Sequence, residues 1–79
     1  MLVTVVGIEA TRGVSKKTGQ PYTGTRVHYE YEIASDKLLG VRADNCWFPS
    51  RVDFEGVAPG MKIEIYYNQF GNPDAYKLA

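Results

Sequence analysis

The residues of this chain best suited to chemistry are cations and aromatic rings placed in turn-forming sequence. The segment "TRGVSKKTGQPY" carries three cations and ends on an aromatic ring: Arg12, Lys16, Lys17 and Tyr22. Downstream, "NQFGNP" places Phe70 among asparagines and a glycine that favour a turn. Cations bind phosphates and exposed rings stack on unpaired bases, so the combination is typical of a surface for single-stranded nucleic acid. The alternative is that both rings fold back as lids over the ends of the core.

The net charge of the chain is zero, yet the charges are unevenly distributed. Residues 1–28 contain four cations and one anion, a net +3, and residues 29–79 carry the balancing −3. The four cations are Arg12, Lys16, Lys17 and Arg26. A polyanion meets the local field rather than the total charge, so a basic end is compatible with nucleic-acid binding. The alternative is a solvated loop whose lysines maintain solubility.

Groups that support catalysis or hold a metal are sparse. His28 is the only histidine and Cys46 the only cysteine, too few for a metal site at ligand spacing. Glu30 and Glu32 share one strand face, where alternating carboxylates are more typical of a solvated sheet than of an acid/base pair. No glycine-rich phosphate loop is present. We therefore predict that the protein is not an enzyme and has no catalytic residue, metal, cofactor or small-molecule substrate.

The hydrophobic pattern predicts strands throughout. Several segments alternate apolar and polar side chains or are rich in valine, and none has the period of an amphipathic helix. The expected strands cover residues 2–8, 26–33, 38–48, 61–67 and 74–78. Five short strands with a long loop after the first predict an all-β fold, a small five-stranded Greek-key OB-fold barrel. The connection 49–60 would take the place of the usual helix.

The strand pattern also assigns the core. Alternation points one set of side chains inward: Val27, Tyr29, Tyr31, Ile33, Met61, Ile63, Ile65 and Tyr67. The adjacent rings of Trp47 and Phe48 point to opposite faces, so one of them is expected to be exposed or at an interface. In the third strand, Gly40 suggests a β-bulge.

The length and composition indicate a single domain, residues 1–79. A chain of 79 residues is close to the size at which one core is barely sufficient, which favours association with a second copy. The run "MLVTVVGI" is much shorter than the roughly 20 residues that cross a bilayer, so no membrane contact is expected. A lone Cys46 suits a reducing cytoplasm, with an intermolecular disulfide as the alternative.

Two segments resemble the filamentous-phage gene V type single-stranded DNA-binding proteins. The segment "TRGVSKKTGQPY" is similar to the DNA-binding loop of that family, in which basic residues and glycines lead into Gly-x-Pro-Tyr. The segment "APGMKIEIYYNQFGNPDAYKL" looks like the family's Ala-Pro-Gly turn, the following strand, its Gln-Phe-Gly loop and its final strand. The chain departs from the family in its final strand, where Lys77 is the only cation, and in "NCWFPSRVDFEG", which has no match.

The resemblance implies a function as well as a fold, and it implies that residues 11–22 belong to an extended β-hairpin arm that binds DNA. The family forms OB-type barrels that pair as two-fold dimers and coat single-stranded DNA cooperatively, without strong sequence preference, during viral replication and before packaging. It implies a location in the cytoplasm of a bacterial host. By position it implies stacking roles for Tyr22 and Phe70 and phosphate contacts for Arg12 and Lys16. The predicted nucleic-acid-binding residues in full are Arg12, Lys16, Lys17, Tyr22, Arg26, Arg42 and Phe70.

Two other functions fit the same residues. A small OB-fold RNA-binding protein is the first alternative, because such a surface accepts either backbone. A protein-interaction module is the second, since the net charge is zero and either Trp47 or Phe48 is expected to be exposed. Salt dependence separates these classes, because binding to a polyanion weakens steeply with salt and an apolar protein contact does not.

Overall fold

The computed structural model describes residues 1–33 and 35–79, which form one antiparallel five-stranded sheet. The strands are β1 (Leu2–Val14), β2 (Pro21–Tyr31), β3 (Arg42–Pro49), β4 (Lys62–Tyr67) and β5 (Pro73–Leu78). They lie in the order β3-β2-β1-β4-β5. The described residues include no helix, and hence none that could cross a membrane. The prediction of an all-β chain with five strands is confirmed.

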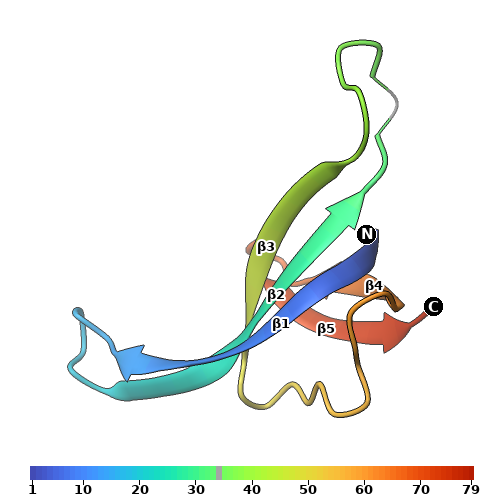
Figure 1. Ribbon diagram of the computed structural model, residues 1–79. Coiled ribbons are helices and arrows are strands. Elements are labelled where there is room, and N and C mark those ends of the chain that lie inside the picture. The colour runs from blue at the N-terminus through green and yellow to red at the C-terminus, as the bar shows by residue number, and fades with distance from the viewer. Residues whose placement is uncertain (34) are drawn as a thin grey trace.

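The sheet curls without closing. β3 and β5 are its edge strands, and they approach each other without pairing through backbone hydrogen bonds. In Figure 1, β4 and β5 cross behind the ribbon formed by β1 and β2. The crossing reflects the strong twist of the sheet. The expected closed barrel is therefore not present among the described strands, and an open, curled sheet is the correct description.

The core lies on one face of this sheet. Its buried side chains are Val3, Val5, Val27, Tyr29, Phe48, Ile63 and Ile65. Within each strand these residues are two positions apart, as expected where one face of a sheet is buried. The predicted burial of Val27, Tyr29, Ile63 and Ile65 is confirmed, whereas Tyr31 and Met61 are only partly buried.

Two residues assigned to the core are exposed. Ile33 is 36% exposed because β2 ends at Tyr31, so Ile33 lies beyond the paired strands. Tyr67 is 41% exposed, and it follows a shift of register between Tyr66 and Tyr67 in the pairing of β4 with β5. The Tyr67 hydroxyl nevertheless lies close to that of Tyr29, and burial raises the pKa of Tyr67, so the side chain stays on the core face and is exposed at the edge of the core.

The predicted bulge at Gly40 is also wrong. β3 begins only at Arg42, and Gly40 lies in the preceding connection with a φ of 102°, a conformation that favours glycine. Besides the shift between Tyr66 and Tyr67, a register shift occurs between Val5 and Gly7 in the pairing of β1 with β2.

The connection from β3 to β4, residues 50–61, covers one end of the core. Phe54 stacks on Tyr76 of β5, with ring centroids 4.5 Å apart and planes 10° apart, and it meets Phe48 edge-on at 5.0 Å. The Tyr76 hydroxyl donates a hydrogen bond to the Asp53 carbonyl at 2.5 Å. The connection was expected to take the place of the helix usual in an OB fold. In the structure it adds a layer of aromatic side chains at this end of the core.

The β1–β2 hairpin extends well beyond the rest of the sheet. β4 pairs with β1 only from Leu2 to Thr4, and β3 pairs with β2 only from Gly24 onward. The two strands continue together to the pair Val14 and Pro21. We call residues 11–23 the arm, and Figure 1 shows it projecting from the body of the molecule. The segment expected to be a long loop after the first strand is thus largely strand, and the predicted hairpin arm is present.

Candidate nucleic-acid interface

The tip of the arm is a tight turn that exposes two lysines. The Ser15 amide donates to the Gln20 carbonyl at 2.9 Å, and the Gly19 amide donates to the Ser15 carbonyl at 2.8 Å. Gly19 has a φ of 70°, the left-handed conformation that a non-glycine residue rarely adopts. The resulting turn leaves Lys16 and Lys17 exposed at the tip, where they can meet an anion without burial.

Tyr22 and Trp47 lie side by side at the root of the arm. Their ring centroids are 6.1 Å apart and their planes are at 84°, an edge-to-face contact. The Trp47 indole N–H donates to the Thr11 hydroxyl at 2.9 Å. Together with Ser15 and Arg26, these three residues line a shallow groove of about 460 Å³, which we call the arm groove.

Glycines under both rings allow this close approach. A Cβ placed at Gly24 would collide with the Trp47 ring and with the Phe48 carbonyl. A Cβ at Gly13 would lie 2.8 Å from the Tyr22 hydroxyl oxygen and 2.9 Å from its Cζ. Each ring therefore packs closely against a glycine, and Tyr22, 43% exposed, is neither a free loop ring nor a lid over the end of the core.

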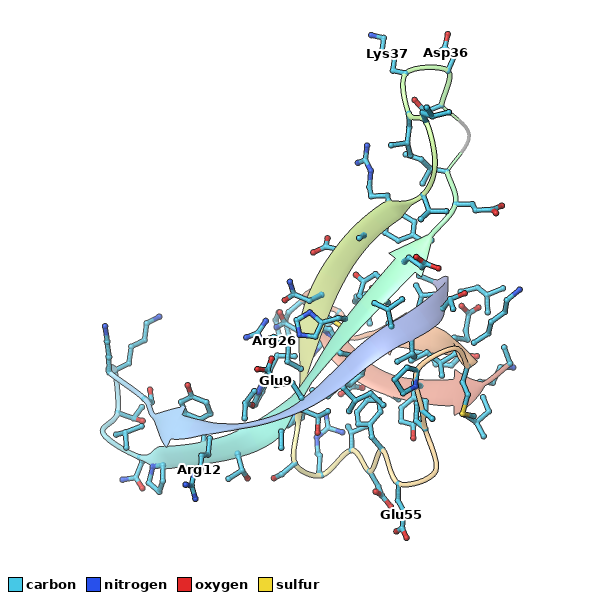
Figure 2. All side chains as sticks on the ribbon, in the orientation of Figure 1. Glu9, Arg12, Arg26, Asp36, Lys37 and Glu55 are labelled. Carbon is cyan, nitrogen blue, oxygen red and sulfur yellow. The ribbon has the colours of Figure 1, made fainter. Side chains whose placement is uncertain are left out.

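Arg26 extends the same face toward the sheet. It pairs across β2 and β3 with Trp47, and its Nη1 donates to Asn45 Oδ1 at 2.6 Å. Glu9 pairs with Arg26 from the other side and contacts His28 Nε2 at 3.2 Å. Figure 2 shows Arg26 and Glu9 near the centre of the sheet. Because Glu9 pairs with Arg26 across the two strands, its carboxylate lowers the positive potential around the guanidinium.

Arg12 points to the opposite face of the arm. It pairs with Thr23, whereas the next pair along the hairpin joins Gly13 and Tyr22. Neighbouring strand residues face opposite sides, so Arg12 and Tyr22 cannot share a surface. Figure 2 shows the Arg12 side chain directed away from the arm on the side of the 50–61 connection. It lines a separate groove of about 570 Å³ that includes Asp53.

Phe70 lies in the β4–β5 turn and is 77% exposed. Asn68 builds this turn, because its Oδ1 accepts hydrogen bonds from the amides of Phe70 and Asn72 at 2.9 and 3.1 Å. Gly71 follows with a φ of 78°. The alternative in which Phe70 closes over the core is therefore wrong.

The β4–β5 turn lies against β3. A second shallow groove, of about 440 Å³, is lined by residues of β3 and of this turn, among them Trp47, Asn68 and Asn72. We call it the turn groove. Trp47 lines both the turn groove and the arm groove, so the structure links the two segments that the sequence had singled out separately.

Arg42 is not part of this arrangement. It opens β3 opposite Tyr31, whereas the arm leaves the sheet at the other end of β3, where Pro49 pairs with Gly24. Seven residues were predicted to bind nucleic acid. Lys16, Lys17, Tyr22 and Arg26 lie on or beside the arm groove, Phe70 lies beyond the turn groove, and Arg12 and Arg42 lie elsewhere.

The predicted cations are available for anions. Within residues 1–33 and 35–79, the ion pairs join the N-terminal amine to Glu64, His28 to Glu9 and Arg51 to Asp74. The five cations named as candidates form no ion pair with a described carboxylate: Arg12, Lys16, Lys17, Arg26 and Arg42. A cation without a carboxylate partner can bind a phosphate without first breaking an internal pair.

Cys46 is poorly suited to chemistry. It lies on β3 opposite Val27, and burial, followed by the nearby Asp44 carboxylate, raises the pKa of its thiol to about 11. The thiolate is the reactive form, so a thiol with this pKa is a weak nucleophile and metal ligand near neutral pH. Among the described residues no three His, Cys, Asp or Glu side chains gather around one point.

Trp47 is the site residue that sequence reasoning did not assign. Alternation indicated that either Trp47 or Phe48 would be exposed, and the structure buries Phe48 completely and leaves Trp47 partly exposed. The deciding signal is the register of β3 with β2, which places Trp47 opposite Arg26 on the outer face. No protein-family model, curated protein or solved structure matches this chain.

Proposed function

We propose that the protein binds single-stranded DNA without catalysis and largely independently of sequence. The observation that carries the proposal is the outer face of the arm, where Tyr22, Trp47 and Arg26 border one groove and Lys16 and Lys17 extend from its far end. Cations would bind the phosphates and aromatic rings would stack on the unpaired bases, as in other proteins that bind single strands. The strand order and the approach of β3 to β5 also support an OB-type relation between the strands.

The proposal is tested by titrating the protein with oligo(dT) at two salt concentrations. Binding should weaken as salt rises, because phosphate contacts release counterions from the strand. A duplex of the same length should bind more weakly, since its stacked bases cannot reach a groove bordered by rings. Binding that does not change with salt would contradict the proposal, and equal or tighter binding to oligo(U) would favour the RNA-binding alternative.

Replacing Lys16 by alanine is expected to flatten the salt dependence. On a single strand each phosphate contact contributes about −0.7 to the slope of log affinity against log salt, so the loss of one contact should reduce the slope by about that amount. Lys62→Ala is the matched control, because Lys62 is exposed on β4 and pairs with Thr4, far along β1 from the tip of the arm. Equal slopes for Lys16→Ala and the wild type would make Lys16 a solubility group.

We also propose that the protein forms a homodimer in the cytoplasm of a bacterial host. Residues 35–41, which lead into β3, project from the sheet and carry the exposed side chains of Leu39 and Val41, and Ile33 is exposed just beyond the end of β2. Leu39 is fully exposed, which is unusual for a large apolar side chain unless a partner covers it.

Light scattering at micromolar concentration should give twice the chain mass of 8.8 kDa. Leu39→Asp should shift the equilibrium toward the monomer, because association would bury an unpaired carboxylate. A wild-type mass of one chain would contradict the dimer, whereas a dimer that persists in the variant would place the interface on another surface.

A further inference from the structure

Trp47 occupies a junction between two grooves. The arm groove leads from Trp47 past Tyr22 toward the exposed lysines, and the turn groove leads from Trp47 to Asn68 and Asn72 at the base of the turn that carries Phe70. Tyr22 thus contacts Trp47 in the arm groove, and the turn that carries Phe70 borders the other groove that Trp47 lines. An extended strand that occupies both grooves would pass Trp47.

The indole ring is held in a fixed orientation. Its inner side rests on Gly24, where no side chain could fit, and its N–H is bound to the Thr11 hydroxyl at 2.9 Å. Tyr22 meets it at 84°, so a flat group stacked on the indole would be edge-on to the tyrosine. A ring fixed in this way loses little conformational entropy when a ligand stacks on it.

The occupant must combine a flat ring with a negative charge. Arg26 lines the same groove, its Nη1 donates to Asn45, and it forms no ion pair with a carboxylate in the described part of the chain. An unpaired nucleotide offers a base for the indole and a phosphate for the guanidinium. An apolar protein side chain would offer the guanidinium no charged partner, and a base within a duplex has no free face.

We propose that Trp47 is the main base-stacking residue of this protein, at the centre of a continuous path for a single strand from Tyr22 to Phe70. Tyr22 forms the wall of the subsite and Trp47 its floor. This inference rests on the proposed function, and it moves the central stacking role from the arm tyrosine to β3.

The test uses the fluorescence of Trp47, the single tryptophan of the chain. Saturating oligo(dT) should quench or shift its emission, because stacking places a base in contact with the indole. An oligonucleotide of the same length whose bases are replaced by abasic sites keeps every phosphate and should leave the Trp47 emission unchanged. It should bind more weakly by at least the stacking loss on one ring, about 1–3 kcal/mol, which corresponds to roughly 5- to 160-fold.

Variants give the second measurement. Trp47→Leu should weaken oligo(dT) binding by a similar factor, Trp47→Phe by less because a ring remains, and Tyr66→Leu, an exposed ring that lines neither groove, by less than about twofold. Circular dichroism checks that each variant is folded. If Trp47→Leu does not fold, the wild-type comparison of the two oligonucleotides decides the question alone.

The possible failures are distinct. Salt-dependent binding of oligo(dT) with unchanged Trp47 emission, or a folded Trp47→Leu variant with wild-type affinity, would overturn the stacking role and leave the proposed function standing. The absence of salt-sensitive binding to any single strand would overturn both.

Discussion

Phe48→Ala should lower the free energy of unfolding by about 3–5 kcal/mol, the usual cost of truncating a buried phenylalanine. Phe48 is fully buried, and its ring contacts the rings of Phe54 and Tyr76 at centroid distances of 5.0 and 6.4 Å. A domain of 79 residues has a total stability of roughly 4–12 kcal/mol, so this one change should remove a quarter or more of it. Urea denaturation followed by circular dichroism measures the effect.

The control for this experiment is Phe70→Ala, which removes the same side chain from a position that is 77% exposed. Its stability should stay within about 0.5 kcal/mol of the wild type, as is usual for surface changes. Similar midpoints for Phe48→Ala and Phe70→Ala would contradict the burial assigned to Phe48 and the aromatic layer built from the 50–61 connection.

Phe70→Ala should instead weaken binding to oligo(dT) by about 1–3 kcal/mol. The ring is exposed on a turn that Asn68 and Gly71 hold in place, so the alanine variant should keep the turn and lose only the stacking surface. The measurement is a pair of binding isotherms at one salt concentration, with thermal melts of the same two proteins.

Phe70→Trp provides the complementary change, because a larger ring on the same turn should bind at least as tightly as the wild type. If the alanine variant binds like the wild type and melts at the same temperature, Phe70 has no part in the interface. If it loses stability without losing affinity, the ring is a structural element after all.

The strands could be predicted where one face is buried and the other is solvated. Val27 and Tyr29 in β2 and Ile63 and Ile65 in β4 repeat every second residue, and the structure buries all of them. The ends of strands could not be predicted in the same way, because a strand ends where its neighbour stops pairing. Ile33 continues the pattern of β2 past the last paired residue, and no local signal marks that limit.

The residue types of the candidate site were evident in the sequence, and their grouping was not. Arg12 and Tyr22 belong to one short segment, yet the strand pairing of the arm sends them to opposite faces. Trp47 joins Tyr22 only because β3 pairs with β2 in one particular register. Contacts of this kind depend on the register between strands. A register shift of one residue would move each side chain of the strand to the opposite face of the sheet.

The connection 49–60 shows the same limit in a longer segment. Its prolines, glycines and charges predicted an irregular loop, and its backbone is irregular after Pro49, the last residue of β3. Its contribution to the core comes from Phe54 stacking on Tyr76, more than 20 residues away in the chain. A single sequence carries no information about which distant ring will be opposite.

The arm pairs only with itself beyond Gly24, and this separates its length from the packing of the core. Insertions or deletions there would alter how far the protein reaches without disturbing any buried side chain. They would have to come in pairs on each strand, because a single added residue would turn the following side chains to the other face. Proteins with this fold should therefore differ by steps of two residues in the length of each arm strand, while the rest of the sheet stays the same. If the arm binds nucleic acid as proposed, the number of nucleotides covered by each molecule should change by steps as well.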